Sequence, residues 1–274
     1  MSLKDNANKA VDEFMALKEC PSMWTNLDRS TIGAGLKVRI DDPDKINQAD
    51  TSLCGPAEFI RDIAEDRPDV YAKAAIDLYK TGRANIDTFS IKPGSDLKKY
   101  ALPSHAGGIH QADWILLASI RDTDNWFFDY QQKNDDMSAI TMPHSKETWL
   151  KKAGFTDIVN ETNVLFCKDI PCASKASALF SKGYKVALFI NSNMLDAGKM
   201  NSPSVTPDHW VALTSPILIN SFNLQHPGAV NEDPASRIEL EVYSWGARHK
   251  IPKSGRLTDY NFSINFYGFI ACRR

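Results

Sequence analysis

The chain lacks the features that mark several large classes of protein. An odd number of cysteines at irregular spacing does not form a regular disulfide framework. Neither sign of charge dominates, because 32 Lys and Arg oppose 34 Asp and Glu and leave a net charge of -2. Proteins built around phosphate neutralisation are basic, so we expect no nucleic-acid partner. The five cysteines are Cys20, Cys54, Cys167, Cys172 and Cys272.

Long apolar runs are also missing. The longest, residues 114–120, is far short of the roughly 20 residues that a membrane-spanning helix needs. The N-terminus carries Asp5, Asp12 and Glu13 where a Sec signal peptide needs an unbroken apolar core. We therefore expect neither a Sec signal nor a membrane span, and a protein that is cytoplasmic or delivered by a dedicated secretion system.

What remains is the composition of an ordinary globular protein, with 43% hydrophobic residues. Apolar spacing and end signals predict helices over residues 9–17, from Thr51 to a break at Pro68, and over 69–80 (before Gly82), 111–119, 146–153 and 173–182. They predict strands over 36–40, 184–191, 209–213, 217–220, 237–243 and 261–271, a turn or edge strand over 157–163, and a loop over 92–110. Helices first and antiparallel strands later is the α+β pattern, so we expect one domain over 1–274, with a helical lobe over about 1–183 and a β-rich lobe over about 184–274.

Cys54 stands where a predicted helix begins. Unpaired N–H groups and the helix dipole at such a position favour the thiolate, which is the nucleophilic form of cysteine. Gly55 would let a substrate approach closely, and Pro56 starts the helix without losing a donor. We expect the sulfur to face solvent. Taken alone, however, a cysteine at this place is more often a small core residue.

Two further residues complete a candidate site. His209 opens a predicted strand, and an imidazole beside a cysteine is the usual way to activate the thiol. Gln48, six residues before Cys54, has an amide N–H2 that would stabilise an oxyanion.

These residues resemble the papain-like cysteine hydrolases. The resemblance rests on the order Gln48, Cys54-Gly55, His209-Trp210 and Ser244-Trp245-Gly246. It implies a papain-like α+β fold in which a helical half with the nucleophile at a helix N-terminus packs on an antiparallel sheet. It also implies that Cys54 is the nucleophile, His209 the general base and acid, Gln48 the oxyanion donor and Trp245 a shield of the histidine.

The sequence departs from that family before Ser-Trp-Gly. Papain-like enzymes commonly have an asparagine there that orients the histidine, and this chain has Tyr243. Ser244, Tyr243, Asp208 and Asp233 are the alternatives for this role.

Other groups of residues in the sequence are weaker candidates for a functional site. His105 and His110 lack a further ligand, and the spacing of Cys167 and Cys172 is neither that of a redox pair nor that of a zinc knuckle. The aromatic run 126–130 and the acidic run 134–136 could line a partner groove, although aromatic runs are more often core. We expect no metal and no cofactor.

Two functions follow as hypotheses. The first is a cysteine hydrolase that cleaves an amide or peptide bond through a thioester, with a protein, a peptide or peptidoglycan as substrate, as a protease, amidase or deamidase. By association such a chain suits a bacterial effector or toxin. The second is a non-catalytic binding module in which Cys54 is a buried structural thiol. The sequence leaves the oligomeric state open.

Overall fold

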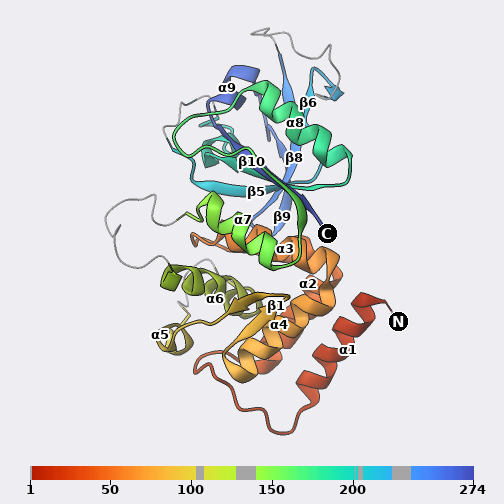
Figure 1. The fold of residues 1–274 in the computed structure, drawn as a ribbon, viewed down its shortest axis with the longest axis vertical. Helices are drawn as coiled ribbons and strands as arrows, with labels where there is room; N and C mark the ends of the chain where they lie inside the picture. Colours follow the sequence, from red (N-terminus) through yellow and green to blue (C-terminus); the bar gives the residue numbers. More distant parts are fainter. Residues whose placement is uncertain (1, 103–107, 128–139, 201, 203–205, 224–235) are drawn as a thin grey trace. The chain divides into compact units, whose positions relative to one another are not determined.

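The chain is a mixed helical and antiparallel-sheet protein (Figure 1), as the α+β pattern predicts. Its computed structural model describes residues 2–102, 108–127, 140–200, 202, 206–223 and 236–274. The chain divides into two compact units. The helical unit comprises Met1–Thr141, Lys152–Gly154 and Trp245–Ala247, and the sheet unit comprises Met142–Lys151, Phe155–Ser244 and Arg248–Arg274.

The helical unit is a set of packed helices with one short hairpin. Helix α6 packs on α2, α3 and α4, and α1 packs on α2 and α4. Helix α4 runs from Pro68 to the left-handed Gly82, as the sequence predicts. The elements are α1 (Leu3–Ala16), α2 (Arg29–Asp41), η1 (Pro43–Lys45), α3 (Cys54–Asp66), α4 (Pro68–Thr81), β1 (Ala84–Ile86), β2 (Phe89–Ile91), α5 (Ser95–Lys99) and α6 (Gln111–Phe127).

Residues 36–40 belong to helix α2, so the prediction of a strand there was wrong. Ile32, Leu36 and Ile40 are all fully buried and lie four residues apart, which is helical spacing. Asp28 caps the helix by accepting a hydrogen bond from a first-turn N–H at 2.7 Å. Apolar residues that bury one face of the helix over two turns therefore favour a helix, although the apolar residues of 36–40 also alternate as they do in a strand.

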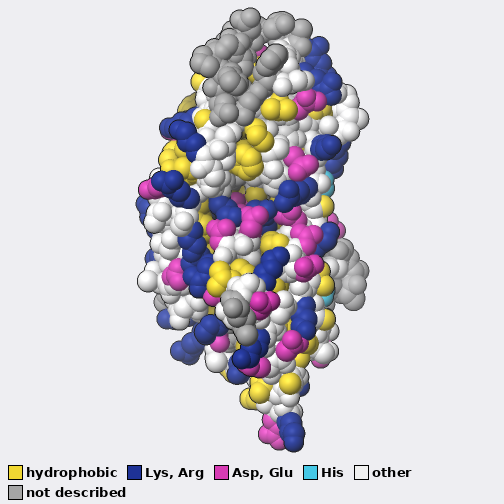
Figure 2. All heavy atoms as spheres, turned by 90° about the vertical axis from the view of Figure 1, so that its right-hand side faces the viewer, with side chains coloured by type: hydrophobic (Ala, Val, Ile, Leu, Met, Phe, Trp, Pro, Cys, Tyr) yellow, Lys and Arg dark blue, Asp and Glu magenta, His cyan; other side chains and the backbone are white. Residues whose placement is uncertain are grey.

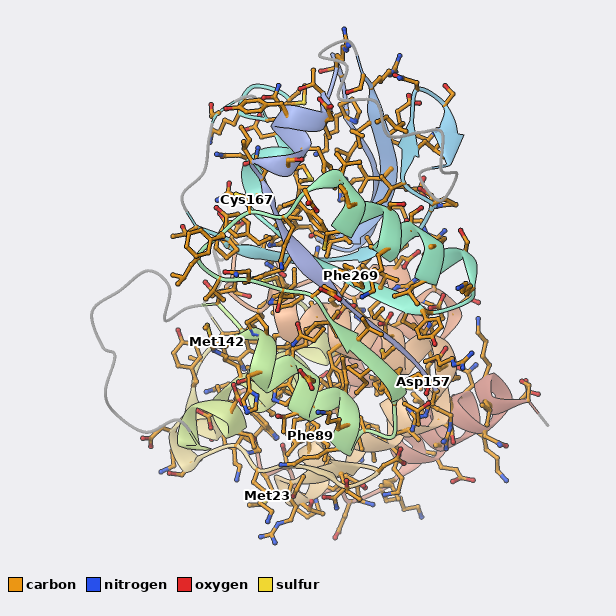
Figure 3. The ribbon with its side chains drawn as sticks, turned by 45° about the horizontal axis from the view of Figure 1, so that its top comes forward. Met23, Phe89, Met142, Asp157, Cys167 and Phe269 are labelled. Carbon is orange, nitrogen blue, oxygen red and sulfur yellow. The ribbon has the colours of Figure 1, made fainter. Side chains whose placement is uncertain are left out.

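The sheet unit contains antiparallel strands in the order β3-β10-β4-β5-β8-β6-β7, with β9 paired to β8. Helix α8 packs on β4 and β10, and Figure 3 labels Asp157 on β3 and Phe269 on β10. The elements are α7 (Pro143–Lys152), β3 (Thr156–Asn160), α8 (Ile170–Ser181), β4 (Lys185–Ile190), η3 (Ser192–Leu195), β5 (His209–Leu213), β6 (Leu218–Ile219), β7 (Phe222–Asn223), β8 (Ile238–Ser244), β9 (Ala247–Ile251), α9 (Asp259–Ser263) and β10 (Phe266–Arg273).

The two faces of the central strands bury different side chains. Val211 on β5 and Val242 on β8 belong to the apolar core that α8 covers. On the other face Phe189 stacks on Trp210 with ring centroids 4.4 Å apart, and the ammonium of Lys146 lies 5.1 Å from the Trp210 ring centroid. This alternation fixes which neighbours each strand residue meets.

Several predicted boundaries differ from the structure. Residues 261–263 belong to α9 and not to a strand, because Thr258 caps that helix by accepting from the Asn261 N–H. The predicted loop 92–110 contains the short helix α5. The helical unit is shorter than the expected lobe 1–183, since α8 packs on the sheet. The edge strand expected within 157–163 is confirmed as β3.

Charges of both signs are mixed on the surface. Figure 2 shows basic and acidic side chains interspersed over the face that it presents. In the part of the chain that the structure describes, no helix is both long and apolar enough to cross a membrane.

Candidate active site

Cys54 is the first residue of α3. The N-cap is Leu53, whose side chain has no acceptor, so the helix begins three residues after the predicted start at Thr51. The first-turn N–H groups of a helix have no partner carbonyl within that helix, and the dipole is positive there, so this position favours a thiolate. The residue is only 4% exposed. The expectation that the sulfur faces solvent was therefore wrong.

Gly55 makes room for a side chain of the same unit. An ideal Cβ at this position would lie 2.3 Å from Oγ1 and 2.4 Å from Cβ of Thr141. The structure therefore gives Gly55 a packing role, whereas the sequence suggested that this glycine lets a substrate approach closely. The Thr141 side chain lies directly against the residue that follows Cys54.

Gly55→Ala is expected to lower the free energy of unfolding by about 1–3 kcal/mol, because the added methyl overlaps Thr141 and one of them must shift. Thermal unfolding followed by circular dichroism measures this. Gly94→Ala is the matched control, since its Cβ would meet only Asp122 Oδ2 at 3.4 Å, an ordinary contact. Equal melting temperatures for both variants would contradict the packing role.

Gln48 lies in a tight loop that leads into α3. Its Nε2 donates to the Thr51 carbonyl at 2.9 Å, and Thr51 Oγ1 donates back to the Gln48 carbonyl at 2.6 Å. The Gln48 residue is 5% exposed. An amide N–H2 carries two hydrogens, so the bond to Thr51 uses one and fixes the direction of the other.

A buried ion pair holds the start of this loop. Arg39 Nε and Nη2 donate to the two carboxylate oxygens of Asp113 at 2.6 and 2.5 Å. The Asn47 N–H donates to Asp113 Oδ2 at 3.2 Å. Burial raises the pKa of Asp113, and the bonds from Arg39 oppose that rise. The pair therefore fixes the residue before Gln48 to α2 and α6.

His209 is the first residue of β5 and pairs with Ile190 on β4. Its Nε2 lies 2.7 Å from Oγ of Ser244, the last residue of β8. Both side chains are buried. The structure thus brings together the histidine and the serine that the sequence proposed as its partner.

The other orienting alternatives have different surroundings. Tyr243 is opposite Ala212 in the pairing of β5 with β8, and it points to the other face of β8 from Ser244. The Asp208 carboxylate accepts from Ser192 N and Oγ at 2.6 and 2.8 Å. Asp233 lies outside the described residues.

Trp245 follows Ser244 in the turn between β8 and β9. Its backbone has a positive φ of 47°, and the residue is 37% exposed. It belongs to the helical unit, as do Cys54 and Gln48, whereas His209 and Ser244 belong to the sheet unit.

The surroundings of His209 favour its neutral form over the imidazolium. Burial, and after it the charge of His249, lower the pKa of His209 to about 3. A buried imidazole loses the hydration that stabilises its charged form. At neutral pH the ring is therefore neutral, and a standing thiolate–imidazolium pair is not favoured.

Two charged residues near these positions were missed by sequence reasoning. Arg121 on α6 donates from Nη1 to the Ile140 carbonyl at 3.3 Å. Burial lowers the pKa of Arg121, and the charge of Asp124 and a thiolate at Cys54 would oppose that lowering. His249 on β9 has its Nε2 2.8 Å from the Ser244 carbonyl oxygen. The sequence signal for Arg121 was its position directly after the apolar run 114–120. The sequence contained no comparable signal for His249.

The remaining sequence candidates are not gathered into a site. His110 Nδ1 accepts from the Ala112 N–H at 3.1 Å, and His105 lies outside the described residues. Among the described residues, no group of three or more His, Cys, Asp or Glu could hold a metal ion. The acidic run 134–136 and the side chains of 126–130 also lie outside the described part.

Comparison with known proteins gives no relative for this chain: no protein-family model, no curated protein and no solved structure matches it.

Proposed function

We propose that the chain is a cysteine hydrolase of the papain-like type that cleaves an amide or peptide bond through a thioester. The observation that carries this proposal is the His209–Ser244 hydrogen bond at 2.7 Å. A histidine held at Nε2 presents Nδ1 for proton transfer, which is what a general base beside a thiol requires. Cys54 on the first turn of α3 supplies the thiol.

The pairing of Cys54 with His209 is itself part of the proposal and rests on the order of these residues in the sequence. Ser244, which binds His209, is followed directly by Trp245 and Gly246, and these residues belong to the helical unit. There an ideal Cβ at Gly246 would lie 3.0 Å from the Cβ of Asn47. Asn47 precedes Gln48, the proposed oxyanion donor. The papain-like architecture that this pairing implies is part of the proposal.

The neutral state of His209 shapes the proposed chemistry. The Cys54 thiol proton passes to His209 Nδ1 as the sulfur attacks the carbonyl carbon and the carbonyl π electrons move to oxygen. Gln48 Nε2 and the Cys54 N–H donate to that oxyanion. The C–N bond breaks, the imidazolium protonates the leaving amine, and the thioester remains. Water then attacks while His209 takes its proton, which releases the acid and restores the thiol.

Alkylation by iodoacetamide near pH 6 tests the first step. We expect Cys54 to react faster than the half-buried Cys172 although Cys54 is more buried, because the helix start and the Arg121 charge favour its thiolate. Arg121→Gln is expected to slow the reaction, and Arg121→Lys to restore much of it. Peptide mass spectrometry of the full chain at successive times gives the rate for each cysteine.

Two other cysteines serve as internal controls for this measurement. Cys167 is exposed, so its rate reports an accessible thiol. Cys172 is half-buried, and burial raises its pKa to about 11, so it should react slowest. A Cys54 rate no faster than that of Cys172 in the folded protein would reject the nucleophile.

The burial of Cys54 favours one other function, a non-catalytic binding module with a structural thiol. With only 4% of the residue exposed, Cys54 also fits the surroundings of a packing residue. Under this alternative, alkylation of Cys54 would begin only when the protein unfolds. For the hydrolase, the candidate substrates are a protein backbone, a peptidoglycan cross-link and a glutamine side chain, as in a bacterial effector or toxin.

A further inference from the structure

His249 and His209 both bind Ser244, by different groups. The His249 ring lies at the backbone, with Nε2 2.8 Å from the carbonyl oxygen. The His209 ring lies at the side chain, with Nε2 2.7 Å from Oγ. All three residues belong to the sheet unit, on the adjacent strands β5, β8 and β9.

The first of these bonds fixes a proton. A carbonyl oxygen only accepts hydrogen bonds, so Nε2 of His249 carries the hydrogen whether that ring is neutral or cationic. The second bond is ambiguous, because a serine hydroxyl both donates and accepts. For His209 Nδ1 to accept a thiol proton, Nε2 must carry the hydrogen and the hydroxyl must accept it. The orientation of Ser244 therefore bears on which tautomer of His209 is present.

We propose that His249 is a positioning residue for the His209–Ser244 pair. It holds Ser244 by the backbone carbonyl and so fixes the hydroxyl that engages His209, and its cationic form opposes a proton on His209. The inference rests on the proposed function only in giving His209 a catalytic task. The bonds themselves are independent of any substrate.

Several other charged groups on the neighbouring strands have their own partners or lie at the far end of a strand. Asp208 binds Ser192, and Arg248 Nη1 lies 3.9 Å from Glu241 Oε1. Lys185 is at the opposite end of β4 from Ile190, the partner of His209. Among the described groups, the charge that lowers the pKa of His209 is that of His249. The remaining charged residues of β8 and β9 are Glu239 and Lys250.

Nuclear magnetic resonance of the histidine rings tests this role without a substrate. In the full chain, the His209 resonance is assigned by its loss in His209→Gln and is followed from pH 8 downward. The wild type is expected to show the neutral ring down to a midpoint of about pH 3. His249→Gln keeps a donor but removes the charge, so the His209 midpoint is expected to rise by about one pH unit.

Two further variants separate the charge from the hydrogen bond. His249→Lys keeps both a donor and a positive charge, so the His209 midpoint should stay close to that of the wild type. His249→Leu removes both, and the ring nitrogen shifts of His209 should then report a mixture of tautomers, as they should in Ser244→Ala. Identical His209 midpoints and tautomers in wild type, His249→Gln and His249→Leu would overturn the proposal. If His249→Leu does not fold, the His209 midpoints of the His249→Gln and His249→Lys variants test the proposal.

The result is distinguishable from a failure of the proposed function. If Cys54 is not a nucleophile, its alkylation is slow, yet the His209 titration still responds to His249. If His249 has no positioning role, the titration is unchanged while Cys54 still reacts fast.

Discussion

Replacing Cys54 by alanine is expected to abolish amide hydrolysis, and His209→Ala to lower kcat by about a thousandfold or more, because nucleophile and base act as a unit. Without the sulfur no thioester forms, and without the imidazole neither the thiol proton nor the amine proton is transferred. Assays for peptide-bond cleavage, for release of peptidoglycan cross-links and for ammonia from glutamine-containing peptides give the activity, one for each candidate amide.

The control for these variants is the other buried cysteine of the chain. Cys272 is 3% exposed and Cys54 is 4% exposed, so both alanine variants lose a buried sulfur. Each is expected to cost about 1 kcal/mol of unfolding free energy, but Cys272→Ala should keep its activity. If both variants lost activity in proportion to their stability, Cys54 would be a packing residue and the hydrolase would be refuted.

The helix and strand pattern was predictable where local signals and burial agree. α4 carries a proline at its first position and a glycine after its last, so both ends were found. α2 was missed because Gly33 and Gly35 weaken its helical propensity. The structure gives their reason: a Cβ at Gly33 would lie 2.5 Å from Met15 Sδ, and one at Gly35 2.2 Å from His110 Cε1. Such close approach between distant segments depends on tertiary packing that a single sequence does not reveal.

The candidate site was predictable to a similar degree. A cysteine at a helix start and a histidine at a strand start are local features, and the structure has both. The choice of Ser244 over Tyr243 depends on which face of β8 each residue occupies relative to His209, and that follows from strand register. The neutral state of His209 depends on burial and on His249, forty residues away in sequence, so no local pattern indicates it.

Asp113→Asn is expected to lower the free energy of unfolding by about 3–5 kcal/mol, because it leaves the buried Arg39 guanidinium without its counter-charge. The side chains of Arg39 and Asp113 are only 7% and 1% exposed, so water does not replace the lost carboxylate. Denaturant unfolding followed by circular dichroism measures the change. The matched control is Asp77→Asn at the exposed Lys73–Asp77 pair, where the lysine side chain is 71% exposed and the expected cost is below about 1 kcal/mol.

The Arg39–Asp113 pair links the stability of the fold to the candidate site. Asp113 also accepts the Asn47 N–H, so a double variant, Arg39→Met with Asp113→Leu, should recover most of the stability while the loop before Gln48 stays unanchored. We therefore expect this double variant to fold and yet to turn over amide substrate more slowly, since the oxyanion donor loses its fixed direction. Full activity in a stable double variant would show that Gln48 is positioned by its bond to Thr51 alone. A cost below about 1 kcal/mol for Asp113→Asn would show that the ion pair is not what holds α2, α6 and the loop together.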